Sequence, residues 1–176
     1  MQKNWYAVYT KPQCEKRVAA LFSKKKIENY CPLSCVETQN FRRHKLVFEP
    51  LFKSYVFVYV TEAETEQLKK TDGVVNLLYW LGKPAIIKDD EIAAIKEFTN
   101  DHRNIMLERT VVNINDVARN FNASSLAIDG KLVTVKNKTL KINLPTLGYT
   151  MIAKIEDDSF FGRNESVLQN KAYINS

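Results

Sequence analysis

Apolar and polar residues follow two different periods in the first hundred positions of the chain. Residues 5–10 (WYAVYT) and 49–60 (EPLFKSYVFVYV) are dense in aromatic and β-branched side chains, a composition typical of strands. Between them, apolar residues in 13–26 recur every three or four positions, which predicts an amphipathic helix. The chain therefore begins with a strand, a helix and a second, strongly apolar strand.

The segments that come next extend this alternation of strands and helices. Residues 31–39 and 45–49 read as two weaker strands on either side of a basic turn, residues 61–73 as a short helix, and residues 74–81 as another strand. The order β-α-β-β-β-α-β predicts an α+β fold in which helices pack on an antiparallel sheet.

Residues 83–99 close this first region with a short strand and a helix. Asp89 has the side chain of a helix N-cap, and Ile92, Ile95 and Phe98 fall on one face of the helix after it. We expect this face to be buried against the sheet, so that residues 1–99 form one N-terminal domain.

The pattern of apolar and polar residues changes after residue 99. Residues 100–110 are polar and aperiodic, which favours a linker. Short β-prone segments separated by turns then follow, the first of which begins at residue 110. They predict a small β-barrel domain over residues 111–176. These segments are 110–115, 124–128, 131–136, 139–144 and 149–155.

Positive charge is concentrated in the first third of the chain. Residues 1–53 hold eleven Lys and Arg against four Asp and Glu, a net +7, whereas residues 54–100 hold five against eight, a net −3. A basic region suits a nucleic-acid backbone, but an ordinary solvated surface explains it equally well. No apolar run approaches the roughly 18 residues of a membrane span. The N-terminus has no apolar export segment, so we expect a cytoplasmic protein.

The residues that most enzymes need are sparse in this chain. Its two histidines, His44 and His102, fall in a basic turn and in the predicted linker, where a buried, oriented base is not expected. We therefore expect no enzymatic activity, no metal and no cofactor. The alternative is a zinc site formed by Cys31, Cys35 and His44, joined by Cys14. Cysteines buried as small apolar residues explain the same positions.

The aromatic strand also comes close to an RNA-reading pattern. The phrase KSYVFVYV agrees with the RNP motif of RNA-recognition modules at four positions, and the rings of Tyr55, Phe57 and Tyr59 share one face. It departs at Ser54 and Val56, where the motif has small residues that let bases approach. An RRM-like protein that binds single-stranded RNA is one interpretation, and a core layer under the helices is the other.

Four segments, taken in order, make the chain similar to the NusG family of transcription elongation factors. They are WYAVYTKPQCEKRV, EPLFKSYVFVYV, GVVNLLYW and KPAIIKDDEIAAI, and together they run through nearly all of residues 4–98. The Met1-Gln2 start, Lys11 and the EPLF…Y phrase resemble the specialised paralogues of the RfaH or UpxY kind. UpxY-type proteins serve polysaccharide operons of Bacteroidetes, so the resemblance implies an operon-specific antiterminator.

The resemblance also implies a polymerase-docking surface. In the family, the N-terminal domain docks on the clamp helices of the largest subunit of RNA polymerase, through a phrase whose aromatics match Phe52 and Tyr55. Ile92 and Ile95 would wall the same pocket, with plain core packing as the alternative. The Pro-Gly of the family's phrase is Lys-Ser in this chain.

Further contacts are implied on other sides of the N-terminal domain. By motif position, Lys11 and Arg17 would touch the non-template DNA strand or nascent RNA. The helix near Glu64 and Thr65 matches the region that faces the polymerase gate loop in the family. Three more phosphate contacts are expected from charge alone, namely Arg42, Arg43 and Lys45.

The C-terminal region lies where the family has a KOW-type barrel. Of the glycine-rich loop of that domain only Gly130 remains, whereas the phrase LPTLGY is a better match. The resemblance leaves open the partner of this region and whether it takes the helical, autoinhibiting form known in one branch, although its β-prone composition favours strands. We expect a monomer that suppresses pausing or termination and makes no membrane contact.

Overall fold

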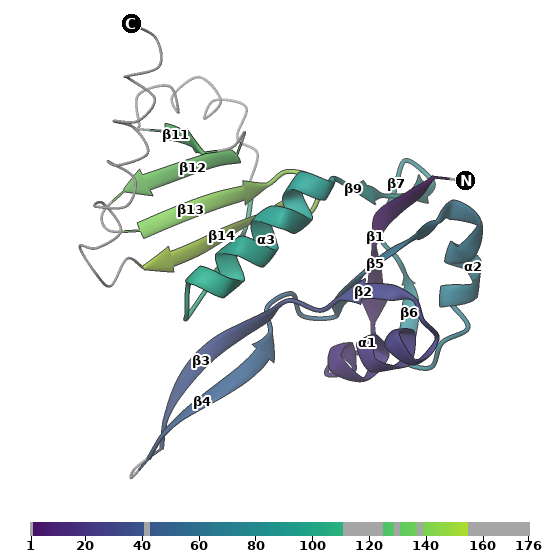
Figure 1. Cartoon of the computed structure of the whole chain (residues 1–176), viewed down its shortest axis with the longest axis horizontal. Helices are drawn as coiled ribbons and strands as arrows, with labels where there is room; N and C mark the ends of the chain where they lie inside the picture. Colours follow the sequence, from purple (N-terminus) through teal and green to yellow (C-terminus); the bar gives the residue numbers. More distant parts are fainter. Residues whose placement is uncertain (1, 41–42, 111–124, 129–130, 137–138, 155–176) are drawn as a thin grey trace, which may run out of the picture.

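The N-terminal part is built on an antiparallel sheet whose central strand is β1 (Figure 1). The computed structural model describes residues 2–40, 43–110, 125–128, 131–136 and 139–154, and every structural statement concerns these residues. One side of β1 pairs with β5, and β2 lies beyond β5, while β6 and β9 pair with opposite ends of its other side. The strands are β1 (Lys3–Thr10), β2 (Glu28–Tyr30), β5 (Tyr55–Thr61), β6 (Val74–Leu77) and β9 (Ile86–Ile87).

Each face of this sheet buries its own apolar cluster. Because side chains alternate along a strand, Tyr6 and Val8 point to one face of β1, and Trp5 and Ala7 point to the other. The helix α1 (Glu15–Lys24) covers the first face, and α3 (Asp89–Asp101) covers the second. The predicted α+β fold with helices on an antiparallel sheet is confirmed.

Two details of the helices and strands differ from the predictions. Helix α3 begins at Asp89 itself, with Lys88 at the N-cap and no side-chain cap, so the prediction of Asp89 as N-cap is wrong. The strand expected at 74–81 ends as β6 at Leu77, although the Leu78 amide still donates to the Ala7 carbonyl of β1 at 2.8 Å. Beyond β6, the chain forms a small hairpin of β7 (Tyr79–Trp80) and β8 (Lys83–Pro84).

Two peripheral elements were expected from the sequence. The short helix after β5 is present as η1 (Glu62–Glu64) followed by α2 (Thr65–Leu68). The two weaker strands form a long hairpin, β3 (Leu33–Asn40) and β4 (Arg43–Pro50), which extends away from the sheet (Figure 1). No helix in the described ranges is long and apolar enough to cross a membrane.

The C-terminal part is a five-stranded antiparallel sheet in the order β10-β14-β13-β12-β11. Four predicted strands are found there, and the fifth, at 110–115, lies mostly outside the described residues. Within the predicted linker, α3 continues to Asp101 and residues 106–109 form the edge strand β10. Closure of the sheet into a barrel stays a prediction. The strands are β10 (Met106–Arg109), β11 (Ser125–Ile128), β12 (Lys131–Lys136), β13 (Thr139–Leu144) and β14 (Tyr149–Lys154).

Gly73 should be the glycine whose replacement costs most stability. Its φ is +89°, and a Cβ there would lie 2.9 Å from Cγ2 of the buried Val18. Gly82 also has a positive φ, +79°, but a Cβ there would meet nothing within 4 Å. We expect Gly73→Ala to lower the free energy of unfolding by about 2–4 kcal/mol and Gly82→Ala by only about 1 kcal/mol. Denaturant titration of both variants checks this, and equal losses would show that the contact with Val18 is easily relieved.

Candidate functional site

The phrase expected to carry the docking aromatics forms the tight loop in front of β5. Phe52 is only 2% exposed, and its ring meets the edge of Phe57 at a centroid distance of 5.3 Å. Tyr55 is half-buried beside Tyr9, with ring centroids 5.4 Å apart. The two predicted residues therefore lie at one end of the aromatic face of the sheet.

Hydrogen bonds from three other segments hold this loop in place. The Leu51 amide donates to the Pro32 carbonyl at 2.8 Å, and the Thr10 amide donates to the Ser54 carbonyl at 2.8 Å. The Ser54 amide donates to Oε1 of Glu15 at 2.6 Å, and Glu15 is only 4% exposed in the first turn of α1. The position of Phe52 thus depends on β1, on α1 and on the segment before β3.

The Lys-Ser pair in this loop has a structural explanation. Ser54 has a φ of +65°, in the left-handed region where glycine is the usual residue. A serine there costs about 1–2 kcal/mol of backbone strain, and the charge-assisted hydrogen bond to Glu15 offsets a similar amount. The buried carboxylate of Glu15 thus lets a non-glycine residue take the family's glycine position.

Ile92 and Ile95 belong to the same apolar cluster as Phe52. They are 2% and 0% exposed, and the cluster also includes Trp5 and Phe57. The structure therefore brings the four residues predicted for docking to one region, with Tyr55 packed against its edge.

The C-terminal sheet covers this region. The ring of Tyr149 meets Phe52 edge-on at a centroid distance of 5.9 Å, and the buried Leu144 and Met151 join the same cluster. At the margin, the Thr146 amide donates to Oε1 of Glu91 at 2.9 Å. Within the part of the chain that the structure describes, the C-terminal region is therefore a β-sheet packed on the predicted docking residues.

The chemistry of Tyr55 fits this covered position. Burial, with smaller contributions from Tyr149 and Tyr9, raises the pKa of its hydroxyl group above the usual value. The phenol therefore stays neutral at physiological pH and acts as an apolar ring with a polar tip.

The base-stacking interpretation of the aromatic strand finds no support. Phe57 is fully buried between the sheet and its cover, so its ring cannot receive a base. The Tyr59 ring packs against Trp5 at a centroid distance of 5.2 Å. The rings of β5 are a core layer, which was the other interpretation of the same letters.

Two predicted nucleic-acid contacts lie near each other. Lys11 is exposed directly after β1, and its amide donates to the Gly73 carbonyl at 2.8 Å. Arg17 on α1 is also exposed and forms an ion pair with Asp72, the residue before Gly73. Both cations therefore border the turn that precedes β6.

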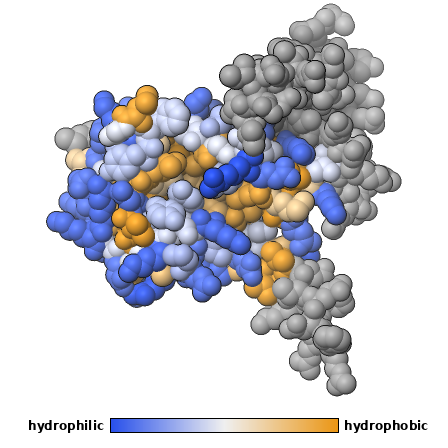
Figure 2. Space-filling model, turned by 180° about the vertical axis from the view of Figure 1, so that it is seen from behind, coloured by the Kyte–Doolittle hydropathy of each residue, from blue (hydrophilic) through white to orange (hydrophobic). Residues whose placement is uncertain are grey.

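The other three predicted cations belong to the β3–β4 hairpin. Arg42 lies outside the described residues, and Arg43 and Lys45 are placed only by the backbone of β4. Nearer the base of this hairpin, Leu46 and Phe48 are exposed, and apolar residues reach the surface in the lower right of the view from behind (Figure 2). Whether these cations contact a nucleic acid stays a prediction.

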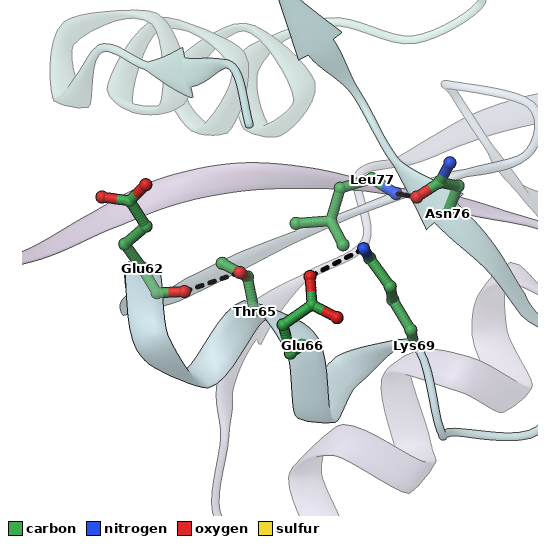
Figure 3. A network of polar contacts seen from close by, with 6 residues as sticks. All are labelled: Glu62, Thr65, Glu66, Lys69, Asn76 and Leu77. Carbon is green, nitrogen blue, oxygen red and sulfur yellow. Dashed lines mark hydrogen bonds and ion pairs between the residues drawn. The ribbon is translucent and has the colours of Figure 1, made fainter. Parts of the chain in front are cut away.

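The residues predicted to face the gate loop make hydrogen bonds within the turn that contains them. Oε2 of Glu64 accepts hydrogen bonds from the amide and the hydroxyl of Thr61, both at 2.8 Å, and these bonds lower the pKa of Glu64. Thr65 is buried, and its hydroxyl donates to the Glu62 carbonyl (Figure 3). Contact with a gate loop stays a prediction, for which Glu64 is the exposed member of the pair.

Two of the three cysteines are placed as small apolar residues, whereas Cys35 lies part-buried in β3 and the His44 side chain lies outside the described residues. Cys14 and Cys31 pack against the cluster under α1, and burial, more than the nearby Glu15 carboxylate, raises the pKa of Cys31 to about 11. Among the described residues, no group of three or more His, Cys, Asp or Glu side chains is arranged to hold a metal ion.

Three functional residues went unrecognised in the sequence, namely Glu15, Glu91 and Tyr149. Glu15 had one available signal, because Ser54 stands where a glycine is expected and needs a compensating partner. The roles of Glu91 and Tyr149 depend on contacts between segments more than fifty residues apart, for which the sequence gives no local signal.

Comparisons with known proteins identify one matching family model and several similar solved structures. The family model described as "NusG: Transcription termination factor nusG" matches residues 3–96, more than half of the chain. Among solved structures, "Domain interaction in Thermotoga maritima NusG" is 18% identical, covers 89% of this chain and 99% of its own, and has a TM-score of 0.46. Two conformations of the MjSpt4:Spt5 complex are 18% and 17% identical, cover 85% and 87% of this chain and 99% of theirs, and have TM-scores of 0.34 and 0.35. No curated protein matches.

We expect Glu15 to stabilise the docking loop through its charge. Glu15→Gln keeps an acceptor for the Ser54 amide but removes the charge, and should lower the free energy of unfolding by about 1 kcal/mol. Glu15→Ala leaves the part-buried amide unpaired and should cost about 2–3 kcal/mol. Denaturant titration measures both, with Glu28→Gln on the exposed edge of β2 as the control. If Glu15→Ala were no more costly than Glu28→Gln, the hydrogen bond would not hold the loop.

Proposed function

Because the chain belongs to the NusG family of transcription factors, we propose that it docks on the clamp helices of the largest subunit of RNA polymerase. The docking surface is the apolar cluster around Phe52, Tyr55, Ile92 and Ile95. Bound there, the protein bridges the polymerase cleft and suppresses pausing or termination. It acts as a non-enzymatic factor in the cytoplasm.

The observation that carries this proposal is the convergence of these four residues under a separate part of the same chain. Apolar burial is not directional. Different sets of apolar side chains can therefore cover the same apolar surface. Tyr149, Leu144 and Met151 occupy the surface here. Docking therefore requires the C-terminal sheet to leave, and the structure corresponds to the closed form.

We place the protein among the specialised paralogues that serve particular operons, such as a polysaccharide locus. The support is the sequence resemblance at the start of the chain and in the EPLF…Y phrase. The non-template DNA strand is the nucleic acid that Lys11 and Arg17 contact, with the hairpin cations as further phosphate contacts.

Loss of the docking aromatics should abolish polymerase capture. A tagged full-length chain should retain nuclease-treated RNA polymerase core enzyme, and Phe52→Ala/Tyr55→Ala should reduce the retained amount at least tenfold, because buried aromatics dominate such contacts. Phe48→Ala, an exposed phenylalanine outside the cluster, is the matched control. Thermal unfolding of each variant verifies that it is folded at the assay temperature.

Whether the double variant retains less or more polymerase than the wild type is informative, because Phe52 also contacts Tyr149 of the covering sheet. Undiminished or stronger capture by the double variant would mean that these rings serve only the closed form. The assignment of the docking surface would then be wrong.

Neutralising the cations beside β6 should weaken DNA binding. We expect Lys11→Ala/Arg17→Ala to lower the affinity for single-stranded DNA several-fold at low salt and to make it less dependent on salt, since two phosphate contacts are lost. Fluorescence anisotropy with a labelled oligonucleotide measures this, and Lys88→Ala/Lys96→Ala on α3 is the charge-matched control. Equal effects of the two pairs would indicate a general charge effect rather than a site.

A further inference from the structure

Glu91 is a buried carboxylate at the junction of the N-terminal part and the C-terminal sheet. Its side chain is 6% exposed in the first turn of α3, next to Ile92 of the docking cluster. Oε1 accepts the Thr146 amide at 2.9 Å, whereas Oε2 is buried with no hydrogen-bond partner among the described residues. A carboxylate accepts at both oxygens, so half of this group is unused.

The partner of Glu91 belongs to the element that covers the docking surface. Thr146 lies in the turn between β13 and β14, and from the same turn Leu147 packs against the apolar cluster. Tyr149, which contacts Phe52, comes two residues later. If the C-terminal sheet leaves, Glu91 therefore loses its only described partner and becomes exposed at the edge of the docking surface.

The charge around Glu91 is negative. Asp89 and Asp90 precede it in the first turn of α3, and both are exposed. Lys88 at the N-cap offsets one of these charges. Removal of the sheet would newly uncover Glu91 next to the apolar side chains of Ile92 and Ile95, whereas Asp89 and Asp90 are already exposed with the sheet in place.

We propose that Glu91 is a specificity-determining residue of the docking surface, and that the polymerase element which replaces the C-terminal sheet brings an arginine or lysine side chain to it. This inference rests on the proposed docking function. A guanidinium group can bond both carboxylate oxygens, whereas the Thr146 amide bonds one. Glu91 therefore favours a basic partner over the protein's own turn.

The test separates the two roles by substituting an uncharged isostere. In Glu91→Gln the amide oxygen still accepts the Thr146 amide but without the charge, so hydrogen exchange at Thr146 should be at most about fivefold faster than in the wild type. Binding of RNA polymerase core enzyme should weaken at least tenfold. Asp90→Asn removes the same charge from an exposed neighbour without touching the interface, and we expect its affinity to stay within twofold of the wild type.

Closure could mask binding, so each affinity is also measured in a loosened background. Leu147→Glu places a charge in the apolar contact of the covering turn and leaves the N-terminal docking residues intact. In this background, Glu91→Gln should still bind at least tenfold more weakly than Asp90→Asn, and with a smaller dependence on salt.

The outcomes distinguish this inference from the function on which it rests. If Leu147→Glu and the wild type both fail to bind polymerase, the proposed docking function is wrong and this inference falls with it. If polymerase binds but Glu91→Gln and Asp90→Asn bind equally well, only the role of Glu91 is refuted. Exchange at Thr146 that is much more than about fivefold faster in Glu91→Gln would show that the charge mainly serves closure, and would also overturn the proposal.

Discussion

The structure depends on covering the second apolar face of the N-terminal sheet. Strands β1 and β5 carry apolar side chains on both faces, so Trp5, Ala7 and Phe57 must be shielded from water as fully as Tyr6 and Val8 are. Helix α1 lies over the Tyr6 face, and Leu68 of α2 joins the apolar cluster there. On the other face, α3 covers one part, and the C-terminal sheet covers the aromatic end near Phe52.

This arrangement makes the candidate site a part of the core in the closed form. Phe52, Ile92 and Ile95 were expected either to receive a partner or to pack internally, and here they pack internally against a sheet from the same chain. The two interpretations are compatible, because the cover is a separate sheet and not part of the N-terminal one. On the proposed function, these residues are core residues in this form and would be interface residues in the polymerase-bound form.

Much of the fold could be predicted because it depends on local periodicity. The alternation in β1 and β5 and the spacing of Ile92, Ile95 and Phe98 are properties of adjacent residues, and the structure confirms them. The two-residue strands β7 and β8 are too short to show a period, whereas the short strand expected before α3 is present as β9. The end of β6 at Leu77 lies within a segment that reads as one strand from 74 to 81, so no local signal marks it.

The candidate site was predictable in part, for a related reason. Phe52 and Tyr55 stood out through a family phrase, but neither the left-handed Ser54 nor its compensation by Glu15 is visible in local composition. The cover itself was unpredictable. Alternating apolar residues in β13 and β14 indicate that one face is buried, and they do not indicate against which surface.

Apolar burial has no preferred direction, and this limits which contacts can discriminate between the C-terminal sheet and a partner. Any element of suitable shape gains much the same energy from covering Phe52 and Ile95, so apolar contact alone discriminates weakly between the C-terminal sheet and a partner. Discrimination must come from groups whose interactions have geometry and charge. Glu91 is such a group, and its closed-form bond to Thr146 leaves Oε2 buried and without a hydrogen-bond partner among the described residues. A buried acceptor without a donor destabilises the state that contains it. The unpaired Oε2 of Glu91 therefore lowers the stability of the closed form relative to a form in which a partner bonds this oxygen.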